Sequence, residues 1–133
     1  MKALTICQPY SELICRGEKR VENRTWDTRY RGPLLIHAGK SRAWFDSDED
    51  LIRDLGSMPP FGAIVASCNL VACIHIDVID HPIAKERYPW LATHAHTNGP
   101  WCWILEDVVR IDPIPYRGAQ GLFNIPEFVL EVA

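Results

Sequence analysis

Short runs in which hydrophobic residues alternate with polar ones recur along most of the chain, and this period of two predicts β-strands. The longest run, residues 63–79, is rich in β-branched side chains, which favour extended structure. Residues 32–39 form a more continuously apolar run that Gly39 ends. Similar runs cover residues 2–6, 20–26, 101–105, 108–114 and 127–132. We therefore expect about six short strands.

Two segments show the spacing of helices instead. A short helix is expected to start at Pro9, which suits a first helical position, and to end before Gly17, which suits a left-handed residue. A second helix is expected over residues 44–55, because the acidic run at 46–50 favours a helix's first turns. Its apolar face would comprise Trp44, Leu51, Ile52 and Leu55.

The order of these elements predicts a small mixed β-barrel. Strands mostly follow strands, without the alternation of strand and helix that builds a doubly wound sheet. Residues 81–100 carry prolines, histidines and a glycine, which indicate an irregular excursion. A closed barrel would also leave no exposed strand edge. A length of 133 residues, 47% of them hydrophobic, suits one domain spanning residues 1–133.

Composition narrows the classes of partner and location. A formal net charge of −3 argues against a grip on long double-stranded nucleic acid, which normally needs a strongly basic surface. The five cysteines lack CxxC spacing and lie mostly in apolar surroundings, which is typical of small reduced core residues. The chain has no secretory leader pattern and no run of about 18 apolar residues. We expect a monomeric, cytoplasmic protein without a membrane partner.

The stretch "GEKRVENRTW" concentrates polar chemistry in ten residues and carries the most specific motif of the chain, G-x-K-x-x-E-x-R at Gly17, Lys19, Glu22 and Arg24. Together with "TRYRGPLLIHA", "GAIVASCNLVAC" and the late "RGAQGL", this motif resembles the ASCH domain family, a branch of the PUA-like superfamily that is related to EVE domains. The resemblance covers nearly the whole chain.

The resemblance implies an α+β fold, a small PUA-like mixed β-barrel of about six strands with two or more flanking helices and a cleft beside the motif. Members are associated with RNA or modified bases, and one bacterial branch hydrolyses N4-acetylcytidine with a lysine, a threonine and a glutamate. Lys19 matches the lysine, whereas Glu22 stands where the threonine is expected. Either the site has been rearranged, or the chain binds without that activity.

A rearranged site would need a new nucleophile. The matching position on the long strand offers Ser67, so the resemblance implies a site of Lys19, Glu22 and Ser67. Lys19 would act as general base and acid, which requires a lowered pKa, and Glu22 would orient it. The alternatives are an ordinary exposed ion pair between Lys19 and Glu22 and a core hydroxyl at Ser67.

Further polar and aromatic residues near the motif are candidates for substrate binding. Arg24 shares a strand face with Glu22 and could either hold that carboxylate or contact a ligand phosphate or carbonyl. Trp26 and Tyr30 could stack on a base. Three amides in segments that match the family could read a base edge: Gln8, Asn23 and Gln120.

No metal or other cofactor is expected, because neither His94-x-His96 nor Cys73-x-His75 has further ligands at zinc spacing. The sequence therefore leaves two functions open. The first is a metal-independent amidohydrolase that removes the acyl group from N4-acylated cytidine or a related nucleoside. The second is a non-catalytic module that binds a modified cytidine nucleoside or short RNA.

Overall fold

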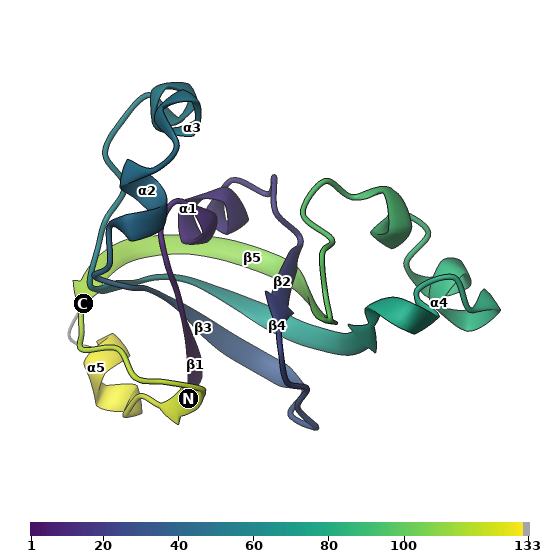
Figure 1. Ribbon diagram of the computed structural model, residues 1–133. Helices are drawn as coiled ribbons and strands as arrows, with labels where there is room; N and C mark the ends of the chain where they lie inside the picture. Colours follow the sequence, from purple (N-terminus) through teal and green to yellow (C-terminus); the bar gives the residue numbers. More distant parts are fainter. Residues whose placement is uncertain (132–133) are drawn as a thin grey trace.

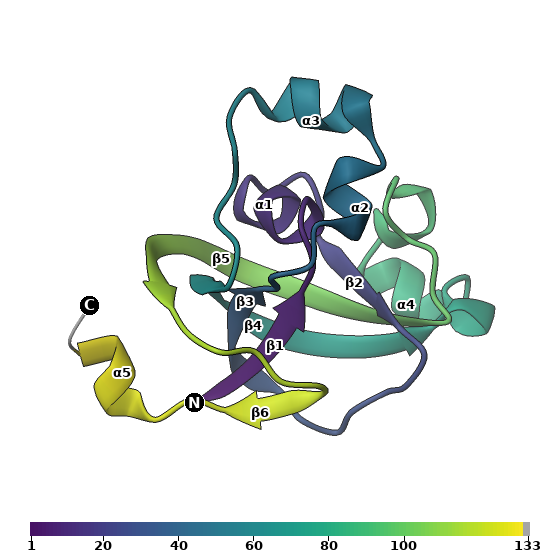
Figure 2. The same ribbon diagram turned by 60° about the vertical axis from the view of Figure 1, so that its left-hand side comes forward.

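One curled sheet of six strands organises the described part of the chain, which comprises residues 1–131 without the side chains of Trp44 and Ile52 (Figures 1 and 2). In this computed structural model the strands lie in the order β2-β5-β4-β3-β1-β6. Their bounds are β1 Lys2–Ile6, β2 Val21–Arg24, β3 Gly32–Ala38, β4 Ala63–His75, β5 Trp101–Pro115 and β6 Leu122–Asn124. β1 and β3 pair in parallel and the other neighbours are antiparallel, so the sheet is mixed.

Alternation along the strands divides the core between the two faces of the sheet. On one face, Leu4 and Ile36 pack with Ile14 of the first helix. On the other face, Leu35 packs with Ile125 from the C-terminal segment. The parallel register of Leu4 with Ile36 places both side chains on the first face.

Short helices cover the sheet and its ends. They are α1 Tyr10–Cys15, α2 Ala43–Asp46, α3 Glu49–Leu55, α4 Pro82–Arg87 and α5 Glu127–Glu131. Figure 1 shows α1, α2 and α3 on the same side of the sheet, whereas α4 lies beyond the end of β4. Single turns of 3₁₀-helix at Ile76–Val78 and Leu91–Thr93 flank α4.

The predicted α+β class, the mixed sheet and the flanking helices are confirmed, with the small PUA-like architecture. The sheet curls into a half-barrel rather than the expected closed barrel. Within residues 1–131, β2 and β6 stand at the two ends of the strand order and do not pair with each other. No helix among those residues is both long and apolar enough to cross a bilayer.

Several element boundaries differ from the prediction. Pro9 is the N-cap of α1 and not its first helical residue. The predicted helix over 44–55 is two helices, since Ser47 ends α2 and the Asp48 side chain caps α3 by accepting from the Leu51 amide at 2.9 Å. The part of its predicted apolar face at Trp44 and Ile52 lies outside the described side chains.

The strands near the C-terminus also differ. Residues 101–105 and 108–114 belong to the single strand β5. The predicted strand over 127–132 is wrong up to residue 131, because this segment forms helix α5; residue 132 lies outside the description. The last strand, β6, comes instead from the connection before that segment. All five cysteines are free; Cys68 and Cys102 are buried in the core, as the sequence analysis expected, whereas Cys7, Cys15 and Cys73 are only partly buried.

Candidate functional site

A tight turn after α1 delivers Lys19 to the sheet. Gly17 has a φ of 80°, which a glycine adopts without strain, and it directs the chain back over the helix. The backbone amides of Glu18 and Lys19 both donate to the Leu13 carbonyl, at 3.0 and 3.2 Å. β2 starts two residues later, so Lys19 enters the same pocket as the side chains of that strand.

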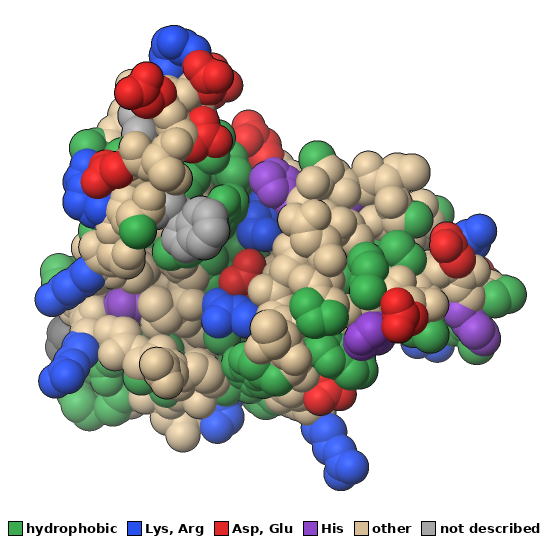
Figure 3. Space-filling view, in the orientation of Figure 1, with side chains coloured by type: hydrophobic (Ala, Val, Ile, Leu, Met, Phe, Trp, Pro, Cys, Tyr) green, Lys and Arg blue, Asp and Glu red, His purple; other side chains and the backbone are tan. Residues whose placement is uncertain are grey.

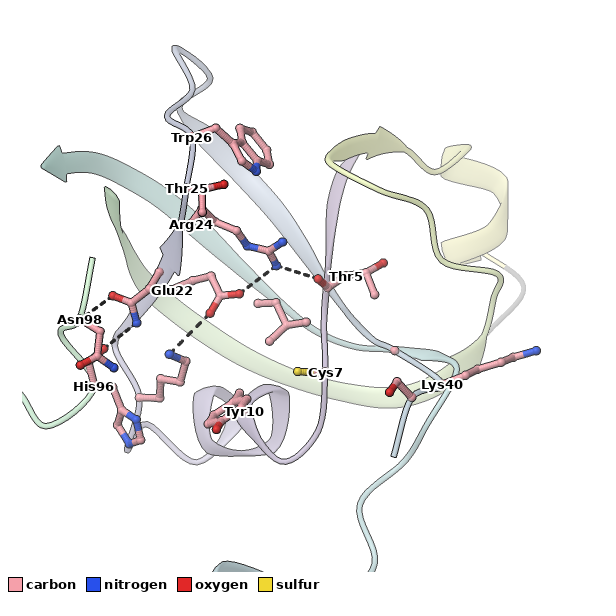
Figure 4. Close-up of a pocket in the computed structure, with 15 residues that line it drawn as sticks. Thr5, Cys7, Tyr10, Glu22, Arg24, Thr25, Trp26, Lys40, His96 and Asn98 are labelled. Carbon is pink, nitrogen blue, oxygen red and sulfur yellow. Dashed lines mark hydrogen bonds and ion pairs between the residues drawn. The ribbon is translucent and has the colours of Figure 1, made fainter. Parts of the chain in front are cut away.

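Lys19, Glu22 and Arg24 form one chain of charges (Figure 4). Glu22 lies between the two cations, with Oε1 3.5 Å from Lys19 Nζ and Oε2 2.9 Å from Arg24 Nη2. The same Nη2 donates to the Thr5 carbonyl at 2.8 Å, which ties β2 to β1. Only 4% of Lys19 and 8% of Glu22 are exposed, so this group is a buried network and not a solvated ion pair.

Burial is the main influence on the Lys19 ammonium and lowers its pKa, because a charged amine loses hydration there. Glu22 opposes this effect, since its nearby negative charge favours protonated lysine. Burial, followed by the charge of Glu22, raises the pKa of the Cys7 thiol, which also lines the pocket. Cys7 is therefore poorly suited to form a nucleophilic thiolate.

The network forms part of the wall of an open pocket of about 690 Å³. In Figure 3, basic side chains flank an acidic one in a hollow near the centre of the face shown. Tyr10 lies beside the network, with its ring centroid 5.6 Å from Lys19 Nζ. The other lining residues are Thr5, Ile6, Cys7, Asn23, Thr25, Trp26, Gly39, Lys40, Ser41, His96 and Asn98.

A loop far away in sequence forms one wall of this pocket, and Asn23 fastens it. The Asn23 amide nitrogen donates to the His96 carbonyl at 2.8 Å. Its oxygen accepts from the backbone amides of Asn98 and Gly99, at 2.9 and 2.7 Å. Asn23 thus uses both ends of its side chain on the loop, and His96 and Asn98 reach the pocket as a result (Figure 4).

The structure does not bring Ser67 to Lys19 and Glu22. In the register of the sheet, Ser67 stands opposite Leu35 on β3 and Val109 on β5. Leu35 packs on the face of the sheet away from α1, so Ser67 shares that face and does not line the pocket. The expected convergence of a serine with the lysine is therefore not found.

The six predicted binding residues divide into two groups. Arg24, Trp26 and Asn23 line the pocket. Trp26 also meets the buried Trp103 edge to face, with ring centroids 4.7 Å apart. The other three, Gln8, Tyr30 and Gln120, do not line it.

These three residues lie elsewhere for structural reasons. Gln8 is fully buried, donates to the Pro60 carbonyl at 2.8 Å and accepts from the Glu12 amide at 3.0 Å. The Tyr30 hydroxyl donates to the carbonyl of Pro33, at the start of β3. Gln120 is exposed in the connection between β5 and β6. Because none of the three lines the pocket, the structure does not support the predicted stacking by Tyr30 or the predicted base reading by Gln8 and Gln120 there.

Sequence reasoning missed part of the pocket. Tyr10, Lys40, His96 and Asn98 all line it, yet none belongs to the G-x-K-x-x-E-x-R motif. Tyr10 comes from α1, just before the motif, and the other three come from two later connections. The polar run "THAHTNG" was a signal for the last two, although only the contacts of Asn23 place it here. Within the described residues, no three or more His, Cys, Asp and Glu side chains cluster as metal ligands would.

Residues 4–115 match the family model of the ASCH domain. The chain belongs to the ASCH domain family. The crystal structure of ASCH from Zymomonas mobilis has a TM-score of 0.57 with 13% identity, over 98% of this chain and 90% of that one. A mutant protein of the same ASCH gives a TM-score of 0.56 with 12% identity, over 98% and 94% of the two chains. At these identities, the likeness shows a shared ASCH fold.

Activating signal cointegrator 1 from Homo sapiens is 26% identical over an aligned length of 130, which covers 92% of this chain. The match covers only 22% of the human protein, so this ASCH chain spans about a fifth of that relative. The motif from Gly17 to Arg24 lies inside the matched ASCH region. Every residue that lines the pocket, from Thr5 to Asn98, lies inside that region as well.

Proposed function

We propose that the pocket is the active site of a metal-independent amidohydrolase, which removes the acyl group from the exocyclic N4 amine of acylated cytidine or a related nucleoside. The observation that carries the proposal is a buried Lys19 with a lowered pKa, fixed beside Glu22 in the wall of an open pocket. A lysine in such a place can be neutral for part of a catalytic cycle. The resemblance to the acetylcytidine-hydrolysing branch of the family suggests the substrate.

The pocket suggests water as the nucleophile, since Ser67 lies on the other face of the sheet. Neutral Lys19 takes a proton from the water, whose oxygen adds to the acyl carbon. Arg24, 23% exposed in its side chain, donates to the oxygen that becomes negative. The bond from the acyl carbon to N4 then breaks, and the Lys19 ammonium returns the proton to N4. The products are a carboxylic acid and the free cytosine amine.

The remaining pocket residues supply recognition. Trp26 and Tyr10 offer aromatic surface for a base, and the amide of Asn98 is exposed at the rim. Glu22 holds Lys19 in position through the 3.5 Å contact. One observation favours the second candidate function, binding of a modified base without hydrolysis: Glu22 stabilises the protonated form of Lys19, which cannot accept a proton.

Hydrolysis of N4-acetylcytidine in the presence of a chelator separates the two functions. We expect wild-type protein to release cytidine, detected by chromatography, and Lys19→Met to lose at least about a hundredfold in kcat/KM, as for removal of a general base. Lys19→Arg should be equally inactive, because arginine keeps its proton. A wild-type protein that releases no cytidine contradicts the enzyme and leaves the binding module.

Ser67→Ala is the matched control for the nucleophile. Because Ser67 does not line the pocket, this variant should keep wild-type kcat/KM. Loss of activity in a folded Ser67→Ala protein would overturn the assignment of water. Thr25→Val and Ser41→Ala test the two exposed hydroxyl side chains that do line the pocket.

A further inference from the structure

A second pocket, of about 810 Å³, opens directly beside the pocket of Lys19. Thr5, Gly39 and Lys40 line both, so the two pockets adjoin at the end of β1 and the segment after β3. In Figure 4, the Lys40 side chain extends away from Glu22, on the side of the first pocket opposite His96. Lys40 therefore borders both pockets.

The second pocket is positively charged. Lys40 and Arg117 are exposed and line it, and no aspartate or glutamate does. Within residues 1–131, neither cation is in an ion pair with a carboxylate. Two unpaired cations facing one cavity are notable in a chain whose formal net charge is −3. Such a place favours a small anion.

Backbone contacts hold Arg117 in place. The Tyr116 amide donates to the Gly62 carbonyl at 3.1 Å, and the Tyr116 carbonyl lies 2.7 Å from Nε2 of the buried His37. A side chain at Gly118 would place its Cβ 2.8 Å from His37 Cε1, so the backbone packs directly on that ring. Arg117 thus projects from a segment anchored on both sides.

The aliphatic part of the Lys40 side chain packs against Gly62. A Cβ at Gly62 would lie 3.0 Å from Lys40 Cγ and 3.1 Å from Cε, so the lysine stem lies across this backbone. The Tyr116 amide, next to Arg117, donates to the Gly62 carbonyl, so Gly62 contacts the segments of both cationic residues. The backbone that carries Arg117 and the stem of Lys40 are consequently supported before a ligand binds, while both charged ends are exposed.

We propose that Lys40 and Arg117 form a phosphate subsite, so that the ligand is a nucleotide whose base occupies the Lys19 pocket and whose phosphate occupies the second. This inference rests on the proposed function for the position of the base. Arginine and lysine are the side chains that bind phosphate oxygens, arginine through its forked donors. A free nucleoside would fill only the first pocket.

Calorimetric titration with ligands that lack the N4-acyl group tests this subsite. The probes are cytidine, its 5′- and 3′-monophosphates and the dinucleotide cytidylyl-3′,5′-cytidine. We expect at least one phosphate-bearing probe to bind about tenfold or more tightly than cytidine at low salt, and this preference to shrink at high salt. A preference for a monophosphate indicates a free nucleotide, and one for the dinucleotide indicates a strand.

The double variant Lys40→Ala/Arg117→Ala should reduce the ratio of nucleotide to cytidine affinity to about one. Lys85→Ala, an exposed lysine on α4, should leave the ratio as in wild type. Equal binding of cytidine and every nucleotide, or a ratio unchanged in the double variant, overturns the subsite even when acetylcytidine is hydrolysed. Tight nucleotide binding that depends on both cations, without hydrolysis, keeps the subsite and rejects the enzyme.

Discussion

Glu22 has two cationic neighbours, and this sets the chemistry of Lys19. One carboxylate oxygen is 2.9 Å from Arg24 Nη2 and the other is 3.5 Å from Lys19 Nζ. The closer arginine takes part of the negative charge that would otherwise hold the lysine protonated. Burial then dominates the lysine, and its pKa is lowered. Glu22 can therefore orient the Lys19 amine although the pKa of that amine stays lowered.

Activity should therefore rise with pH as Lys19 loses its proton. In the proposed mechanism the neutral amine is the active form, so kcat/KM for N4-acetylcytidine should increase up to a plateau. The midpoint should lie below 10.5, the ordinary pKa of lysine, because burial favours the neutral amine. A pH–rate profile measures this midpoint directly.

Glu22→Gln is the variant that moves the midpoint. It removes the negative charge that raises the pKa of Lys19, so the rising limb should shift to lower pH, even where the plateau is reduced by lost orientation. Asp107→Asn, on β5 and outside the pocket, should not shift it. A profile that is the same in wild type and Glu22→Gln would show that another group titrates.

Local chemistry was predictable from the sequence, and the position of a distant side chain was not. Lys19, Glu22 and Arg24 lie within six residues, so their convergence follows from one turn and one strand. Ser67 was proposed from its place in the segment that matches the family, and that place does not tell which face of the strand meets α1. That face is decided by the pairing of Ser67 with Leu35, 32 residues earlier in the chain.

At the scale of elements, the pocket depends on how β2 holds the 96–99 loop. The loop has no strand or helix of its own between Thr93 and Trp101. Three of its backbone polar groups form hydrogen bonds with the side chain of Asn23, which accepts two of these bonds and donates one. Because Asn23 directly follows Glu22, the network and the opposite wall share one strand.

Asn23→Ala should loosen this wall. Loss of three hydrogen bonds, two of them from backbone amides, should lower the free energy of unfolding by about 1–3 kcal/mol. Amide hydrogen exchange at Asn98 and Gly99 should become faster, and KM for the acylated nucleoside should rise more than kcat falls. Urea denaturation, exchange and kinetics measure the three effects.

Asn69→Ala provides the comparison, since this amide donates only to the Asp107 side chain at 3.0 Å on the exposed part of β4 and β5. It should change stability by no more than about 0.5 kcal/mol. Unaltered exchange at Asn98 and Gly99 in Asn23→Ala would mean that the loop is held by other contacts.

Elements with strong local patterns were predicted, and those that depend on distant partners were not. β1 matches its predicted range of residues 2–6, because its pattern of apolar residues is enough to indicate a strand. Residues 127–131 have the composition of a strand, yet β1 already has β3 on one edge and β6 on the other. With that edge taken, the segment forms α5, where Val129 and Leu130 pack near Ile125.

Across the whole molecule, one buried carboxylate joins α1 to β5 of the curled sheet. Glu12 accepts from Arg110 of β5 at 2.7 and 2.9 Å and from Arg16 of its own helix at 2.7 Å. Arg16 also donates to the Leu55 carbonyl at the end of α3. These contacts hold α1, the helix that precedes Lys19, to both β5 and α3. The network therefore positions the pocket without lining it.

Glu12→Gln should destabilise the fold in a manner that depends on pH. The hydrogen bonds from Arg110, aided by Arg16 and opposed by burial, hold the pKa of Glu12 below its ordinary 4.5. A carboxyl group with a lowered pKa contributes stability that is present above pH 4.5 and lost as the pH falls through the folded-state value. Urea denaturation at pH 7 should show a loss of about 1–3 kcal/mol in Glu12→Gln, and this difference should shrink as the pH falls below 4.5.

The exposed pair of Asp50 and Arg53 on α3 supplies the control for this effect. Asp50→Asn should change stability by less than about 0.5 kcal/mol at either pH, because both side chains are largely in water. If Glu12→Gln lost the same stability at every pH, packing and not charge would be the cause. If it lost none at pH 7, α1 would be held by its apolar face alone, through Leu13 and Ile14. A loss confined to higher pH instead assigns the docking of α1, and with it the position of Lys19, to the ionised Glu12.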